Sequence, residues 1–308
     1  MPRFFKYVSP IIFTFIISGV NSSLLAQELE PRLLTNIPVK SNILAVGYGY
    51  AWGDMLLDPA ITIENFNAKI NSFMGAYVRS IKLFGMSGKV DVVVPFSIAD
   101  WSGTYNGNYE EASQTGFGDL RMRLSVNFLG APPISLTEIK DYKPKSIMGF
   151  SLQVIAPTGA YDSSILPNLG ANRWAFKTQL GFAQHFNKDW IMELYLSSWF
   201  FTPNNNYLNG KELKQSPFLG IKGHLIKTFK NRMWATIDVG YGYGAEPTVD
   251  GVKKNVTISS YVIGASAAVP IGIKHTLRFT AKSSFRIKQG PDFDGLFITY
   301  QYFWNKNK

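Results

Sequence analysis

The 308-residue sequence predicts an all-β fold: a closed antiparallel transmembrane β-barrel of about twelve strands that follows an N-terminal signal peptide. Three observations support this fold. Apolar and polar residues alternate along many segments, many of these segments are about ten residues long, and no apolar stretch of about 18 residues follows Ala26. Tilted membrane strands need about 9–11 residues, whereas the strands of soluble proteins average about 5–6.

The composition excludes several other classes of protein. Aromatic residues make up 15% of the chain and charged residues 17%. A disordered chain has few aromatic residues, and an ordinary soluble domain carries about 25% charged residues. The chain has no cysteine, which excludes disulfides, thiolate metal sites and a catalytic cysteine.

The first 26 residues have the pattern of a secretory signal peptide. Arg3 and Lys6 precede an apolar stretch at residues 11–17, and Ala26 precedes the expected cleavage position. The apolar stretch is shorter than the roughly 20 residues of a spanning helix, although an uncleaved N-terminal anchor is the alternative. We therefore expect an exported protein of the Gram-negative outer membrane, with a signal peptide at 1–26, a short periplasmic N-terminal segment at 27–41 and the barrel at 42–308.

Strand positions follow from the alternation, which is clearest between Leu120 and Phe128. There, apolar residues at even positions alternate with polar residues such as Arg121 and Arg123. We expect twelve strands, with about ten or fourteen as alternatives, because bacterial outer-membrane barrels have an even number of strands. The predicted strands are 42–52, 66–80, 89–97, 116–129, 146–156, 172–186, 190–201, 217–228, 233–243, 256–269, 275–287 and 295–304.

The connections and the tryptophans give two further checks. Connections after odd-numbered strands are mostly long, whereas 187–189 is a tight turn, as expected for outside loops and periplasmic turns. A soluble sandwich also alternates, but it gives no reason for tryptophans to gather at strand ends. We expect one tryptophan, Trp101, in a loop and the others near the two rims, with Trp199 and Trp234 on the lumen side: Trp52, Trp174, Trp199, Trp190, Trp234 and Trp304.

No motif indicates catalysis. Val46–Gly49 and Val239–Gly242 look like a potassium filter, but such a filter needs four chains and pore helices. In a barrel, their glycines suit inward positions and their tyrosines outward ones. The three histidines are scattered and have no helix-spaced partner. We therefore expect no enzyme, no cofactor and no metal site.

Inward-facing charges are the most informative feature of the predicted barrel. The inward basic residues are Lys69, Arg79, Lys89, Arg121, Arg123, Arg173, Lys177, Lys222, Arg278, Lys282 and Arg286, and the inward acidic residues are Asp91, Asp119, Glu193 and Asp238. This excess of positive charge predicts a passage that favours anionic solutes. The alternative is a packed lumen whose arginines and lysines are paired. The candidates for lining the path are Arg121, Arg123, Arg173, Lys177, Lys282 and Arg286.

An ordered series of short motifs carries a family resemblance. The motifs are Glu30–Arg32, Asn36–Pro38, Gly47–Tyr50, Asp91, Pro95–Phe96, Thr115–Leu120, Ala156–Tyr161, Leu169–Lys177 and Gln215–Pro217. Together they resemble the MetA-pathway of phenol degradation family, outer-membrane transporters of Gram-negative bacteria. The resemblance implies an outer-membrane β-barrel that moves aromatic or other small organic solutes.

The expected function is therefore passive or facilitated passage of small organic solutes, aromatic or anionic, across the outer membrane. The alternative is a non-transporting barrel with a structural role or with loops that bind a ligand; an outer-membrane enzyme is a third class, which would need a serine and a histidine in contact. Expected partners are the small-molecule solute, outer-membrane lipid and lipopolysaccharide, and the barrel-assembly machinery, and no nucleic acid is expected.

Overall fold

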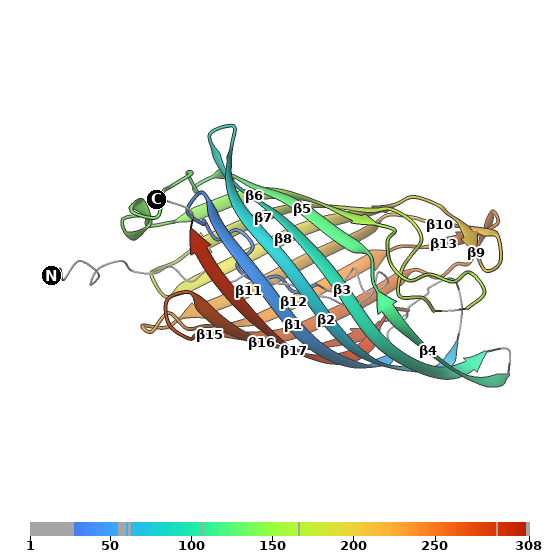
Figure 1. Ribbon diagram of the computed structural model, residues 1–308. Helices are drawn as coiled ribbons and strands as arrows, with labels where there is room; N and C mark the ends of the chain where they lie inside the picture. The colour runs from blue at the N-terminus through green and yellow to red at the C-terminus, as the bar shows by residue number, and fades with distance from the viewer. Residues whose placement is uncertain are drawn as a thin grey trace.

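A computed structural model describes residues 28–54, 60, 63–105, 107–165, 167–287 and 289–305, so the predicted signal peptide lies outside the described residues. Figure 1 shows long tilted strands arranged side by side as a barrel. The predicted all-β barrel is confirmed. No helix in the described part of the chain is long and apolar enough to span a membrane.

Twelve long strands form the barrel wall. They are β1 (Ser41–Asp54), β2 (Glu64–Leu83), β3 (Met86–Tyr105), β5 (Leu120–Leu129), β6 (Ser146–Ala156), β7 (Ala175–His185), β8 (Trp190–Phe201), β11 (Phe218–Thr228), β12 (Trp234–Gly244), β15 (Ile258–Pro270), β16 (His275–Arg286) and β17 (Asp292–Asn305). Most bounds agree with the predicted ranges within three residues.

The wall closes through its first and last strands. β1 pairs antiparallel with β2 on one side and with β17 on the other, with Ser41 opposite Asn305. The remaining wall strands pair with their neighbours in the chain, and β2 also pairs with β3. Closure gives every wall strand two partners, which satisfies the backbone groups that lipid cannot hydrogen-bond.

Among the described residues, five further strands and one 3-10 helix lie outside the twelve-strand wall. They are β4 (Asn108–Phe117), β9 (Asn204–Tyr207), β10 (Lys211–Gln215), β13 (Pro247–Val249), β14 (Val252–Lys253) and η2 (Glu138–Lys140). β4 pairs with one half of β3 and β5 with the other half. Between them, the Gly118 N–H donates to the carbonyl of Pro95, a residue that has no N–H of its own.

We call the two ends of the barrel the turn end and the loop end. The turn end holds the start of β1, the end of β17 and most of the short turns, whereas the loop end holds β4 and the small sheet of β9, β10, β13 and β14 (Figure 1). β3 continues past its predicted end to Tyr105, so Trp101 lies in a strand and not in a loop, and it is buried. The outward residues of this extension include Asp100 and Ser102, so the apolar alternation that marks a lipid-facing strand is lost there.

Burial alternates along the wall strands as the sequence predicts. In β5 the even-numbered Met122 and Leu124 are exposed on the outside, and the odd-numbered Arg121 and Arg123 are buried inside. Gly49 also faces inward: a Cβ atom there would lie 2.3 Å from the Phe297 ring, so the lumen needs glycine at this position.

Candidate functional site

The lumen contains the chain's own N-terminal segment, which we define as residues 28–40. Nearly all side chains of residues 28–38 are buried, and their partners are inward-facing residues of most of the wall strands. This position differs from the periplasmic one expected from the sequence. The physical reason is charge: the segment brings two carboxylates, Glu28 and Glu30, into a lumen with an excess of basic residues.

Glu28 and Glu30 form one buried ionic cluster with basic residues of three wall strands. Glu28 Oε1 lies 2.5 Å from Arg121 Nη1, and Glu30 Oε1 lies 2.5 Å from Arg123 Nη1. Lys177 Nζ bridges the two carboxylates at 3.2 and 3.3 Å. These ion-paired side chains are at most 7% exposed, and such charges remain buried only when they are paired and hydrogen-bonded.

Two further residues complete this ionic cluster. Arg123 also donates to Asp91, with Nη2 2.8 Å from Oδ1. Lys222 Nζ donates to the backbone carbonyl of Glu28 at 2.7 Å and lies 3.7 Å from Glu30 Oε2. Four cations therefore face three carboxylates, so most of the positive excess predicted for this level of the lumen is neutralised.

The next part of the segment is held through its backbone. The Arg32 N–H donates to Glu193 Oε2 at 2.6 Å, and the guanidinium lies 5.7 Å from the centroid of the Trp234 ring. Lys89 Nζ donates to the Leu33 carbonyl, and Asn127 Nδ2 donates to the Leu34 carbonyl at 3.0 Å. Inward polar side chains thus replace the hydrogen bonds that a strand partner would otherwise supply.

Apolar side chains fix the end of the segment nearest β1. Leu33, Leu34 and Ile37 pack in one buried cluster with inward residues of the wall, including Ile147 and Tyr195. Leu34 occupies a notch at Gly149 and Gly181: a Cβ atom at Gly149 would lie 2.5 Å from its Cδ2, and one at Gly181 would lie 3.0 Å from its Cδ1. The N-terminal segment therefore has an ionic part, residues 28–30, and an apolar part, residues 33–37.

A loop covers the lumen from the other side. The connection 157–174 places Leu169, which is fully buried, in a cluster with Trp101 and Phe297. Asp119, which was predicted at the outer mouth, accepts the Gly159 N–H at 2.8 Å and the Ala171 N–H at 2.9 Å. Both ends of the loop are therefore held by one carboxylate at the start of β5.

Local hydrogen bonds also order the middle of this loop. The Ser164 hydroxyl and backbone N–H donate to Asp162 Oδ1 at 2.6 and 2.8 Å. These bonds stabilise the carboxylate and lower the pKa of Asp162. The Asn168 side chain donates to the carbonyls of Asp162 and Ile165.

The six predicted lumen-lining residues occupy different positions. Arg121, Arg123 and Lys177 meet in the ionic cluster, and Lys282 is buried with its Nζ 5.0 Å from the centroid of the Phe297 ring. Arg173 lies in the loop before β7, where its guanidinium stacks 4.6 Å from the Phe201 centroid and donates to Gln215. Arg286 lies at the loop-end rim, 44% exposed, and pairs with Asp54.

Two other predicted inward positions are wrong. Lys69 is exposed on the outer surface, because its neighbours Ala68 and Ile70 are the buried residues of β2. Arg79 also has outward parity, and it donates to Asn42 Oδ1 at 3.1 Å. The alternation in β2 is ambiguous because apolar residues such as Ile70 face the lumen there, so polarity alone does not identify the inner face.

Sequence reasoning missed two of the three acidic residues of the cluster. Glu28 and Glu30 precede the first strand. The sequence signal that could have identified them is the presence of two carboxylates next to a barrel whose inward residues carry an excess of positive charge. It also missed a buried row across β8, β11 and β12, in which His224 Nδ1 lies 2.7 Å from Asp238 Oδ1 and Glu193 accepts from the Tyr195 hydroxyl. No group of three or more metal-ligating residues that could hold an ion occurs in the described residues.

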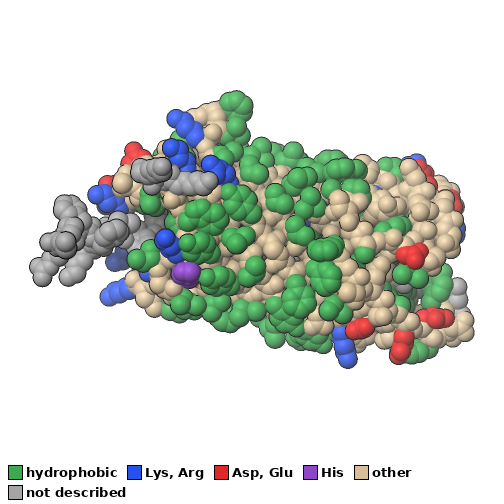
Figure 2. Space-filling model, in the orientation of Figure 1, with side chains coloured by type: hydrophobic (Ala, Val, Ile, Leu, Met, Phe, Trp, Pro, Cys, Tyr) green, Lys and Arg blue, Asp and Glu red, His purple; other side chains and the backbone are tan. Residues whose placement is uncertain are grey.

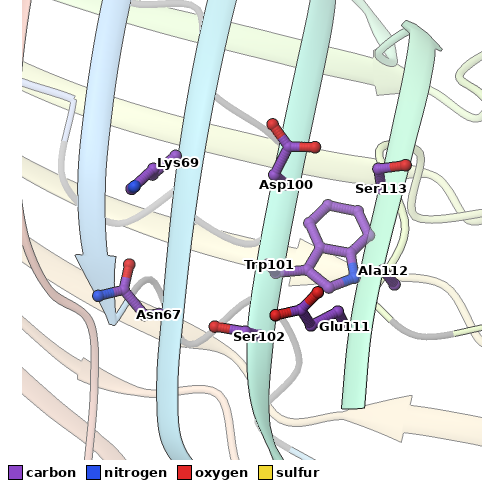
Figure 3. Close-up of a pocket in the computed structure, with 8 residues that line it drawn as sticks. All are labelled: Asn67, Lys69, Asp100, Trp101, Ser102, Glu111, Ala112 and Ser113. Atoms are coloured by element: carbon purple, nitrogen blue, oxygen red, sulfur yellow. The ribbon is translucent and has the colours of Figure 1, made fainter.

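A polar pocket of about 560 Å³ lies away from the ionic cluster, at the loop-end extension of β2, β3 and β4 (Figure 3). The register places its polar residues in two cross-strand rows: Asn67, Ser102 and Glu111, and Lys69, Asp100 and Ser113. These residues alternate with the buried Ala68 and Trp101, so their side chains point away from the lumen.

The fold and the sequence agree with one family. The family model described as MetA-pathway of phenol degradation matches residues 58–300. The comparison with curated proteins gives no match. Among solved structures, the chain is similar to the COG4313 outer membrane channel from Pseudomonas putida F1, with 18% identity over 90% of this chain and 100% of that chain and a TM-score of 0.75.

A second similar structure is the β domain of the Bordetella autotransporter BrkA. It has 13% identity over 86% of this chain and 100% of that chain, with a TM-score of 0.52. At these identities the two structures establish the outer-membrane barrel fold. The resemblance drawn from the ordered motifs is confirmed by the family match.

Proposed function

Since this chain belongs to the MetA-pathway of phenol degradation family, we propose that it is an outer-membrane channel for small organic solutes. In this proposal the turn end faces the periplasm and the loop end faces outward, because outer-membrane barrels have short periplasmic turns and longer outside loops. Passage through the barrel needs no bond-making step.

The ionic part of the N-terminal segment carries this proposal. Glu28 and Glu30 are held in the lumen by ion pairs and hydrogen bonds to Arg121, Arg123 and Lys177, and not by a continuous strand pairing. Ion pairs exchange with water or with a competing anion when the lumen is hydrated. Displacement of residues 28–30 opens the lumen at this level and leaves its cations facing the path.

The same contacts indicate the solute class. The two glutamate carboxylates occupy positions that the carboxylate of an anionic solute could take, because arginine favours bidentate contact with carboxylates. An aromatic surface lies next to them: Lys177 Nζ is 5.0 Å from the centroid of the Trp199 ring. We therefore propose small aromatic carboxylates as the preferred solutes.

One observation favours the non-transporting alternative. The lumen is filled from both ends, by the N-terminal segment and by the loop 157–174, and its charges are largely paired. A barrel whose segment never moves would serve a structural role or bind a ligand through its loops.

Conductance and solute uptake distinguish these two functions. We expect the purified full chain in a planar bilayer to be mostly closed, with brief anion-selective openings. Glu28→Gln with Glu30→Gln should lengthen these openings several-fold, because neutral amides bind the arginines more weakly. The matched control is Glu64→Gln with Glu111→Gln, which changes two exposed glutamates at the loop end.

Liposome swelling then tests the solute class. Swelling should be faster with benzoate than with neutral benzamide, and the preference should decrease as salt screens the lumen charges. A barrel that conducts no ions and admits neither solute, with or without the glutamates, would establish the non-transporting alternative. An equal response to benzoate and benzamide would retain the channel and reject the anionic preference.

A further inference from the structure

The two ends of the barrel differ in charge. Lysine and arginine side chains gather at the turn end, and acidic side chains gather at the loop end (Figure 2). At the turn end, Lys140, Lys143 and Lys145 are exposed in the connection between β5 and β6. This asymmetry gives the turn end a positive surface.

Exposed apolar side chains lie beside the lysines of four other turns. The apolar residues are 46% to 88% exposed, and each lies in the connection between two wall strands. Each lies within two residues of an exposed lysine in the sequence. The four pairs are Phe84 with Lys82, Phe186 with Lys188, Phe229 with Lys230, and Ile273 with Lys274.

The lysines lie just beyond a belt of outward aromatic residues, which we define as Tyr77, Trp190, Tyr302 and Trp304. Tyr77 and Tyr302 each contact Trp304, with ring centroids 6.2 and 5.5 Å apart. Lys227 Nζ lies 4.8 Å from the centroid of the Trp190 ring. Tyrosine and tryptophan gather at the headgroup level of membranes, so this belt places the turns next to lipid headgroups.

Acidic groups at this end do not neutralise the four turn lysines. Asp189 pairs with Lys227 at 3.5 Å, and Glu138 accepts hydrogen bonds from Ser135. Within the part of the chain that the structure describes, no ion pair or hydrogen bond involves the ammonium groups of Lys82, Lys188, Lys230 and Lys274. These four cations are available to a ligand.

We propose that the turn end of the barrel binds anionic phospholipid headgroups. The apolar side chains of the four turns enter the membrane interface, and the adjacent lysines contact the phosphodiester groups of the same leaflet. Apolar side chains interleaved with lysines are the composition that binds anionic lipid surfaces. This inference requires the outer-membrane location but not passage through the lumen, so the two can fail separately.

Lipid retention tests the proposal. The purified full chain would be reconstituted into discs of phosphatidylcholine and phosphatidylglycerol, and the lipid retained after partial delipidation would be measured. We expect phosphatidylglycerol to be enriched several-fold over the supplied ratio. Lys82, Lys188, Lys230 and Lys274, each changed to Gln, should remove most of this enrichment, because each interfacial lysine changes binding by about fivefold.

The matched control removes the same number of exposed lysines from the loop end: Lys211, Lys214, Lys253 and Lys254, each changed to Gln. It should retain the enrichment. Gel migration of unheated and boiled samples verifies that every variant folds. Equal retention of both lipids by the unchanged protein would overturn the proposal, and so would an equal loss in the control. An acidic protein partner would then be the remaining occupant of this surface.

Discussion

Arg123 and Leu124 are neighbours in β5 and face different surroundings. Leu124 is 39% exposed on the outer face, where lipid would surround it. It needs no specific partner residue in the chain. Arg123 is buried inside and contacts Asp91 from the paired strand β3 and Glu30 from the N-terminal segment. Two consecutive residues thus have different requirements: Leu124 needs only to be apolar, whereas Arg123 needs specific charged partners.

The comparison extends to the two faces of the whole wall. The outer face can exchange one apolar residue for another, because lipid adapts to its shape. The inner face is matched to residues 28–38, so a change there alters contacts with a segment that is distant in the sequence. Function in the proposed channel therefore depends on the inner face, and insertion into the membrane depends on the outer face.

The largest effect should come from the inner face. Arg123→Gln removes the bidentate partner of Asp91 and one cation from Glu30 in a buried site, and breaking a buried ion pair from one side costs about 3–5 kcal/mol. The free energy of unfolding, measured with urea in lipid vesicles by tryptophan fluorescence, should fall by about this amount. Arg123→Lys should lose less, because it keeps the charge. If the Gln and Lys variants had equal free energies of unfolding, the charge of Arg123 would not contribute to stability through its ion pairs.

The next effect concerns the outer face of the same strand. Leu124→Arg places a charge in lipid, which costs about 2–4 kcal/mol near the bilayer midplane. Vesicle refolding yield and the free energy of unfolding should both decrease. Leu124→Ile is the matched control and should be nearly neutral, because the outer face needs apolarity and not a particular shape. A large cost for Leu124→Ile would remove the distinction between the two faces.

A third change addresses the apolar part of the N-terminal segment. Leu34→Ala empties the notch at Gly149 and Gly181, and we expect a cost of about 2–3 kcal/mol, the low end for a buried leucine. Because the notch anchors the segment next to β1, this variant should also raise the hydrogen-exchange rate of residues 33–37. Unchanged exchange at residues 33–37 would mean that the notch does not anchor this part of the segment.

Much of the wall could be predicted because it repeats one rule. Alternation predicted β6 and β8 with their observed bounds and the inward direction of Trp199 and Trp234. Alternation gives a wrong prediction where the outward residues are polar or the inward residues are apolar. Beyond the lipid, the extension of β3 has polar outward residues, so alternation predicts a loop there. In β2, apolar inward residues make alternation predict the wrong direction for Lys69.

The site could be predicted only in part, because its partners are set by three-dimensional packing. The inward direction of Arg121, Arg123 and Lys177 follows from alternation, but their contact with Glu28 and Glu30 spans 93 to 149 residues of sequence. Hydrophobic periodicity cannot predict the position of the N-terminal segment, because this segment has no regular secondary structure. Net charge gave the one available indication, since a strongly positive lumen needs anions, and the chain itself supplies them.

The smallest effect separates two residues that the sequence treats alike. Arg286 was predicted to line the lumen together with Arg123, but its side chain is 44% exposed, and its partner Asp54 is 18% exposed. Water screens such a pair, and exposed ion pairs contribute about 0–1 kcal/mol. Arg286→Gln should therefore change the free energy of unfolding by less than about 1 kcal/mol, and the change should vanish at high salt, whereas the cost of Arg123→Gln should persist. Parallel urea unfolding of the two variants at low and high salt measures this difference. Equal, salt-insensitive losses would show that the loop-end rim is as dry as the ionic cluster, and the contrast between rim and lumen would then have no physical basis.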